Sequence, residues 1–209
     1  MSTARDELLA RIRAAIADAE PVAVMRAYRE VGTLDRAAVV ERFVERVEDY
    51  GATVIRSSDP AAAAAASLSG RVVIARDLPA SLRPAGVELV EDDGLCARQL
   101  DEVDAALTTC AAACAETGSI ALDGGPGQGR RAITLVPDLH VCIVREADIV
   151  ETVPELIDRL APSAREGRPI VIVSGPSATS DIELDRVEGV HGPRRMVVIL
   201  HDQSIASER

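Results

Sequence analysis

Ala52-Thr53-Val54-Ile55 and Arg71-Val72-Val73-Ile74-Ala75 are two short apolar runs, and an alanine-rich segment, residues 61–66, lies between them. Each run is bounded by chain-breaking residues and is nearly continuous in apolar side chains. This pattern is typical of a strand that is buried on both faces of a parallel sheet. The alanine-rich segment predicts a helix that crosses from the first strand to the second. The stretch therefore predicts a βαβ unit and a fold of the α/β class.

The same alternation continues on both sides of this unit. A helix is predicted over residues 35–50, because apolar side chains recur on one face of it and Gly51 follows as a stop. Another helix is predicted in the alanine-rich run around Cys110 and Cys114, which would share one helix face. Strands alternating with helices predict a three-layer α/β/α sandwich. The inward residues of the helix over 35–50 are Val39, Val40, Phe43 and Val47. Further strands are predicted at 87–90, 105–108, 119–122, 140–144, 170–173 and 196–200.

The N-terminal segment predicts a helical extension. Apolar residues at Leu8, Ile12 and Ile16 recur at helical spacing between residues 3 and 19, and Pro21 ends the pattern. We interpret residues 1–38 as an arm and residues 39–209 as the main domain. The arm is expected to dock either on its own domain, which we favour, or on a partner subunit.

Composition excludes several classes of function. The 209 residues carry a formal net charge of -11, which argues against nucleic acid or an anionic membrane surface as the main partner. All 23 basic residues are arginine, so a Schiff-base lysine and a lysine-dependent P-loop are excluded. The four cysteines form no Cys-x-x-Cys pair, and no run of about 18 apolar residues predicts a membrane span. We expect a cytoplasmic protein with reduced thiols and no bound metal.

Residues 175–183, Gly-Pro-Ser-Ala-Thr-Ser-Asp-Ile-Glu, follow a predicted strand and collect a turn, hydroxyl groups and carboxylates. We expect a short helix to start here, with free N–H groups that attract an anion. Asp181 would then stabilise the helix dipole and Glu183 would reach Arg194, Arg195 or His191. Alternatively, hydroxyl groups would hold the carboxylate of a hydroxy acid. The candidate ligand-binding residues of this segment are Gly175, Ser177, Thr179, Ser180, Asp181 and Glu183.

Two further segments offer candidate residues. Glu116, with Thr117 and Gly118, lies just before the strand predicted at 119–122, and it either faces a cleft or closes the turn. His191 precedes a Gly-Pro turn and is either a general acid or base, since its ordinary pKa is near 6.5, or a residue that only pins the turn.

Residues 123–131, Asp-Gly-Gly-Pro-Gly-Gln-Gly-Arg-Arg, form a glycine-rich segment. No capped helix follows and residues 132–136 look extended, so a dinucleotide-binding fingerprint fails. The segment is interpreted as a plain hairpin loop, or else as a mobile loop whose Arg130 and Arg131 close over an anionic ligand.

Taken in order, the segments 115–119, 135–140, 175–183 and 190–193 resemble the LUD-domain family, and the resemblance runs from about residue 39 to residue 200. It implies the fold group of the sugar-phosphate isomerases and CoA transferases. It also implies that Glu116 could be a nucleophile or a base.

The resemblance further implies a role as a subunit that, with two iron–sulfur partner subunits, oxidises L-lactate to pyruvate. The chain shows no flavin, nicotinamide or cluster motif, so we expect the redox cofactors, iron–sulfur clusters, on the partners. This chain would bind a small carboxylate or phosphate ligand. The alternatives are a stand-alone CoA-transferase-like enzyme that uses Glu116, and a ligand-responsive binding module without chemistry.

Overall fold

The computed structural model describes residues 3–18, 24–25, 27–180, 186–188 and 191–202. Its centre is a six-stranded sheet in which every neighbouring pair is parallel. In spatial order the strands are β1 (Thr53–Ser57), β12 (Arg195–His201), β7 (Leu139–Arg145), β4 (Ala105–Thr109), β2 (Arg71–Ile74) and β3 (Glu88–Glu91). The helices are α1 (Ala4–Ala15), α2 (Arg36–Asp49), α3 (Pro60–Ser67), α4 (Ala97–Asp101) and α5 (Val153–Arg165), with 3-10 turns η1 (Ala80–Leu82), η2 (Arg131–Thr134) and η3 (Glu146–Asp148).

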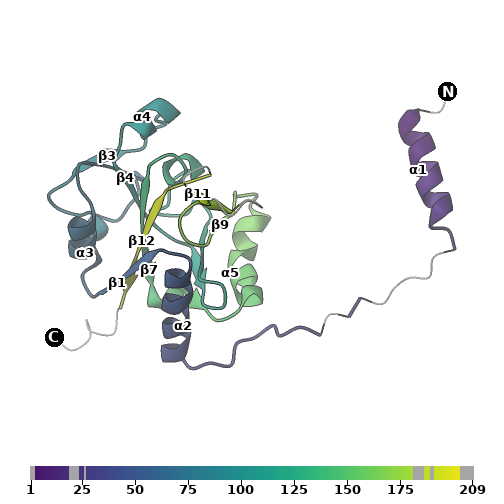
Figure 1. Ribbon diagram of the computed structural model, residues 1–209, viewed down its shortest axis with the longest axis horizontal. Helices are drawn as coiled ribbons and strands as arrows, with labels where there is room; N and C mark the ends of the chain where they lie inside the picture. The colour runs from purple at the N-terminus through teal and green to yellow at the C-terminus, as the bar shows by residue number, and fades with distance from the viewer. Residues whose placement is uncertain (1–2, 19–23, 26, 181–185, 189–190, 203–209) are drawn as a thin grey trace.

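Strand β7 shows how the sheet is covered on both faces. Val141 and Ile143 pack in one cluster with Ala64 of α3, whereas Cys142 and Val144 pack in another with Phe43 of α2. Successive side chains of a strand point to opposite faces, so a strand in the middle of the sheet must be apolar throughout. Figure 1 shows α3 and α5 on opposite sides of the central strands. The predicted three-layer α/β sandwich is confirmed.

The prediction of a helix around Cys110 and Cys114 is wrong. Ala112–Cys114 forms strand β5 of a second sheet, whose order is β8 (Ile149–Val150), β5, β6 (Ser119–Leu122) and β9 (Val171–Val173). This sheet lies between the main sheet and α5, so β5 is buried on both faces. Alanine favours helices in isolation, but here β5 pairs with β6 and β8 and is buried between the two layers, and this tertiary context overrides that propensity.

The first βαβ unit is also rearranged. β1 and β2 are parallel members of one sheet, as predicted, but β12, β7 and β4 lie between them. The crossing helix α3 contacts β12, β1 and β7. The C-terminal strand thus inserts next to the first strand, and no local pattern in residues 52–75 could predict that pairing.

The helix predicted over residues 35–50 is confirmed as α2. Asp35 caps it by accepting a hydrogen bond from the Ala38 N–H at 2.9 Å, and the four predicted inward residues are buried. Gly51 follows with a φ of +82°, in the left-handed region that favours glycine at a helix end.

The N-terminal arm divides into two parts. Helix α1 forms as predicted, but none of its residues is buried, and Figure 1 shows it away from the sheets. Docking of this helix on its own domain is therefore not observed. Residues closer to the domain do dock, because the N–H groups of Gly32 and Leu34 donate to Glu155 and Glu151 at 3.1 and 2.7 Å. No helix among the described residues is long and apolar enough to cross a bilayer.

Candidate functional site

The pairing of β6 with β9 brings two sequence motifs together. Ile120 lies opposite Val173 in this antiparallel pair, so the turn before β6 meets the turn after β9. A chain of hydroxyl groups joins the turns, since the Thr117 Oγ1 donates to the Ser119 Oγ at 2.8 Å and the Ser119 Oγ lies 2.8 Å from the Ser174 Oγ. Thr117 therefore belongs to a network that supports the second motif.

The glycines of the two motifs both lie against the end of α2. Gly118 has a φ of +59°, and a Cβ there would stand 2.7 Å from the Arg46 carbonyl carbon. Gly175 has a φ of +73°, and a Cβ there would stand 2.6 Å from the Tyr50 Cβ. Both positions therefore need glycine for backbone conformation and for space.

Ser177 and His191 are held side by side. The Ser177 N–H donates to the Pro193 carbonyl at 2.8 Å, and the His191 N–H donates to the Ser177 Oγ at 3.0 Å. A Cβ added at Gly192 would stand 3.6 Å from the Ser177 Cβ, at ordinary contact distance. The Gly-Pro-Ser and His-Gly-Pro segments thus form one structural unit, although 14 positions separate Ser177 from His191.

This unit borders a cavity of about 240 Å³. Four of the predicted site residues line it, namely Arg131, Gly175, Ser177 and His191. Residues that the sequence interpretation did not assign to a site complete the wall: Thr134, His140, 171–174, Pro176, Gly192, Pro193 and Met196. We take this cavity as the candidate functional site.

Arg131 supplies the positive charge of the cavity. Its Nη1 donates to the Thr134 carbonyl and to the Thr134 Oγ1, each at 3.1 Å, and its Nε and Nη2 donate to none of the residues that the structure describes. Burial lowers the pKa of Arg131 from its ordinary value, and Arg131 takes part in none of the ion pairs between the described residues. A partly desolvated cation with donors unused by the described part of the chain is suited to bind an anion.

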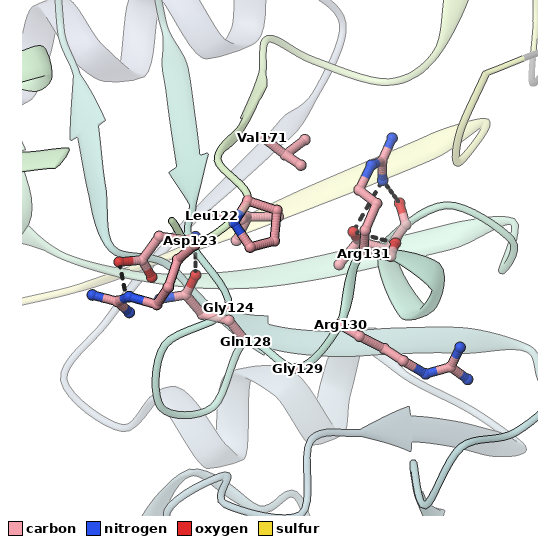
Figure 2. A pocket seen from close by; sticks show the side chains of 11 residues that line it. Leu122, Asp123, Gly124, Gln128, Gly129, Arg130, Arg131 and Val171 are labelled. Atoms are coloured by element: carbon pink, nitrogen blue, oxygen red, sulfur yellow. Dashed lines mark hydrogen bonds and ion pairs between the residues drawn. The ribbon is translucent and has the colours of Figure 1, made fainter. Parts of the chain in front are cut away.

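A side pocket, of about 310 Å³, adjoins this cavity and shares Arg131, Thr134 and Val171 with it. Figure 2 shows this pocket and the different directions of the two arginines, with the guanidinium groups of Arg130 and Arg131 well apart. Arg130 donates from Nε to Asp92 at 2.7 Å and also contacts the Leu95 carbonyl, so it is committed to an ion pair with a buried carboxylate.

The glycine-rich segment is neither a hairpin nor an open loop. It leads from the second sheet to η2, which replaces the extended backbone expected at residues 132–136. Asp123 and Gln128 are buried and hold the segment from inside, and the Gly127 N–H donates to Asp77 at 3.0 Å. These contacts fix the direction in which Arg131 enters the cavity.

His140 is a further residue of the cavity wall. Its Nε2 lies 2.8 Å from the Thr108 Oγ1, so one ring nitrogen has a hydrogen-bond partner. Burial, with the nearby charge of Arg131, lowers its pKa to about 4, so the ring is neutral at pH 7. His140 therefore contributes a neutral polar surface beside the Arg131 cation.

Glu116 lies in the turn between β5 and β6, and not at the end of a helix as expected. Its Oε1 accepts from Arg29 at 3.1 Å, and its Oε2 accepts from the Val153 N–H at 3.4 Å. Glu116 is not among the residues that line the cavity. Its observed contacts are those of a side chain that joins the arm to the start of α5.

The helix expected after Gly175 is not formed in its first part. Ala178–Ser180, with Thr179 at its centre, is strand β10, which pairs antiparallel with β11 (Arg186–Glu188). Strand pairing here satisfies the backbone groups that a helix start would have left free for an anion. Asp181 and Glu183 lie outside the described residues, so their predicted roles stay predictions.

The chain is similar to known proteins of one family. The family model of the LUD domain matches residues 69–201. A lactate utilization protein C of Deinococcus radiodurans is 46% identical over 202 residues, which cover 94% of this chain and 95% of that protein. A protein of the same name from an Exiguobacterium species is 35% identical over 104 residues, covering 47% of this chain and 45% of that protein.

A similar structure has also been solved. The crystal structure of a DUF162 family protein from Deinococcus radiodurans gives a TM-score of 0.72 at 39% identity, covering 81% of this chain and 100% of that chain. The matched residues 69–201 contain the Glu-Thr-Gly turn, the glycine-rich segment and the Ser177–His191 unit. The chain belongs to the LUD domain family.

Proposed function

We propose that this protein works in lactate utilization, as a subunit of an assembly that oxidises L-lactate to pyruvate with iron–sulfur partner subunits. The names of its relatives support the pathway. In this proposal the cavity beside Ser177 and His191 binds the carboxylate of lactate or pyruvate, and this chain holds no redox cofactor of its own.

The observation that carries the binding proposal is that Arg131 lines the cavity without an ion-pair partner among the described residues. Its guanidinium enters a cavity of about 240 Å³, a suitable size for a three-carbon acid, and it takes part in none of the ion pairs between the described residues. A guanidinium grips a carboxylate with two parallel hydrogen bonds. The hydroxyl groups of Ser177 and Thr134 lie in the same wall and can bind the hydroxyl group of lactate.

The oxidation itself defines what the partners must supply. Conversion of lactate to pyruvate breaks the O–H bond and the C–H bond at carbon 2 and releases two protons and two electrons. In this proposal His191, which lines the cavity, accepts the hydroxyl proton. We assign the two electrons to clusters on the partner subunits.

Calorimetric titration with L-lactate and with pyruvate tests the binding proposal. The unmodified chain should bind one of them, and Arg131→Gln should weaken that binding about tenfold or more, since a charge-assisted pair is lost. Arg98→Gln is the matched control, because Arg98 is exposed on α4 and lines neither pocket. Equal affinity in Arg131→Gln and the unmodified chain would reject the cavity as the acid-binding site.

Purification of the tagged chain under anaerobic conditions from lactate-grown host cells tests the assembly. We expect cysteine-rich companions, iron–sulfur absorption and lactate-dependent reduction of a dye. A colourless chain without companions that still binds lactate would reject the assembly and leave the binding proposal intact.

A further inference from the structure

A second cavity lies at the opposite end of the central strands. It has a volume of about 620 Å³ and is lined by Cys110 just after β4, Arg145 at the end of β7 and His201 at the end of β12. The cavity beside Ser177 is instead reached by His140 and Met196, which lie near the first residues of β7 and β12. These two cavities share no lining residue. The side pocket of about 310 Å³ lies between them, because it shares Arg131 with the first and Asp123, Gln128 and Arg168 with the second.

The length of the strands keeps the two cavities apart. β7 and β12 each span seven residues, so their ends are separated by about 20 Å at the usual rise per residue. The second cavity lies outside the carboxyl ends of parallel strands. This is the edge at which α/β proteins most often bind small molecules.

Three guanidinium groups converge on this cavity from three different segments. Arg145 donates to the buried Asp148 with two hydrogen bonds, at 2.6 and 3.0 Å. Arg168, which precedes β9, lies 3.1 Å from the buried Asp123 and 3.0 Å from the exposed Glu166, and it donates to the Ser163 Oγ at 2.7 Å. These carboxylates fix the two arginines in place while using only part of their five donors.

Arg159 completes the set from helix α5. Its Nη2 donates to the Ala147 carbonyl at 3.3 Å, and it is absent from the ion pairs between the described residues. The lining therefore holds three arginines and two carboxylates, Asp123 and Asp148, in a chain whose formal net charge is -11. The carboxylate of Glu166, which pairs with Arg168, lies outside the lining. A cationic cavity in an acidic protein concentrates anions locally.

Cys110 does not change the charge of the cavity lining. The neighbouring Cys142 and then burial raise the pKa of the Cys110 thiol, so it is neutral at pH 7. The volume of the cavity exceeds that of the cavity beside Ser177 more than twofold, which suits a ligand larger than a three-carbon acid. Several arginine forks at fixed positions match the spread oxygen atoms of linked phosphates.

We propose that this second cavity binds a small molecule that carries a diphosphate group, with Arg145 and Arg168 as fixed contacts and Arg159 as the arginine that closes on the anion. The site is distinct from the carboxylate site around Arg131, since no residue lines both cavities. It assigns a binding role to residues at the carboxyl edge that the sequence motifs do not include.

Calorimetric titration of the full chain with sodium pyrophosphate tests the proposal, at low ionic strength and with and without L-lactate. The unmodified chain should bind pyrophosphate in both conditions. Arg159→Gln should weaken binding about tenfold, and Arg159→Glu should weaken it further. Arg165→Glu is the matched control, because Arg165 is exposed on the same helix and does not line the cavity.

Three outcomes would overturn the proposal: absence of pyrophosphate binding, equal weakening by Arg165→Glu, or loss of binding in Arg131→Gln, which would place the anion in the other cavity. Arg159 is exposed and lies outside the ion pairs between the described residues, so circular dichroism should show Arg159→Gln to be folded. The outcome does not depend on lactate binding, so failure here and failure of the lactate proposal are distinguishable.

Discussion

Replacing Gly175 by alanine should destabilise the protein more than the same change at Gly51. Both glycines adopt a positive φ, +73° and +82°, so alanine costs about 1–2 kcal/mol of backbone strain at either position. A new Cβ at position 51 meets no atom within 4 Å. At position 175 it would stand 2.6 Å from the Tyr50 Cβ and 2.8 Å from the Tyr50 carbonyl oxygen. Part of that contact is backbone, which cannot rotate away, and such overpacking adds about 1–3 kcal/mol.

The free energy of unfolding is measured by urea titration followed by circular dichroism, because the chain has no tryptophan for fluorescence. Gly51→Ala should lose about 1–2 kcal/mol and Gly175→Ala about 2–5 kcal/mol, with the same slope against urea. Equal losses at the two positions would refute the steric argument. Gly175→Ala should also weaken lactate binding, because Gly175 sets the direction of the wall that contains Ser177.

Three further results are expected. Burial, with the charge of Arg131, lowers the pKa of His140 from 6.5 to about 4. Between these two pH values the unfolded state binds more protons than the folded state, so about 3 kcal/mol of stability is lost as the pH falls from 6.5 to about 4. His140→Gln should flatten this pH dependence of the unfolding free energy in urea titrations. Thr152→Ala removes a buried N-cap that accepts from the Glu155 N–H and should cost about 1–2 kcal/mol, whereas an unchanged urea midpoint would contradict it. Deletion of residues 1–18 should leave the unfolding free energy unchanged, because α1 buries no residue, but should reduce co-purification of partner subunits if α1 docks on them.

The parts of the fold that depend on local periodicity could be predicted from the sequence. The inward face of α2, including Phe43 and Val47, follows from spacing alone, because a helix must bury one continuous stripe. The apolar run of β7 likewise indicates a strand that is covered on both faces. These inferences need no knowledge of which elements become neighbours.

Pairings between distant segments could not be predicted. The sequence of β5 predicts a helix because alanine dominates it, and β5 is a strand only because it packs with β6 and α5. Arg130 and Arg131 are adjacent and chemically equal in the sequence. They differ in the structure because the chain brings Asp92 to Arg130 and brings none of the carboxylates in the described ion pairs to Arg131. The selection of one arginine as a ligand contact is a property of the tertiary fold.

The position of Glu116 bears on the choice between a subunit and a stand-alone enzyme. Arg29 bridges Glu116 at 3.1 Å and the buried Glu151 at 2.6 Å, so this glutamate helps to fasten the arm to the domain. A nucleophile or base must face its substrate, but both oxygens of Glu116 already accept hydrogen bonds and the residue is absent from the cavity wall. Glu116→Gln keeps the shape and weakens the ion pair, so it should loosen the arm without changing lactate affinity. Faster proteolysis before residue 36 in Glu116→Gln, with an unchanged calorimetric titration of lactate, would favour the role as a subunit. Loss of turnover by the isolated Glu116→Gln chain would favour the stand-alone enzyme.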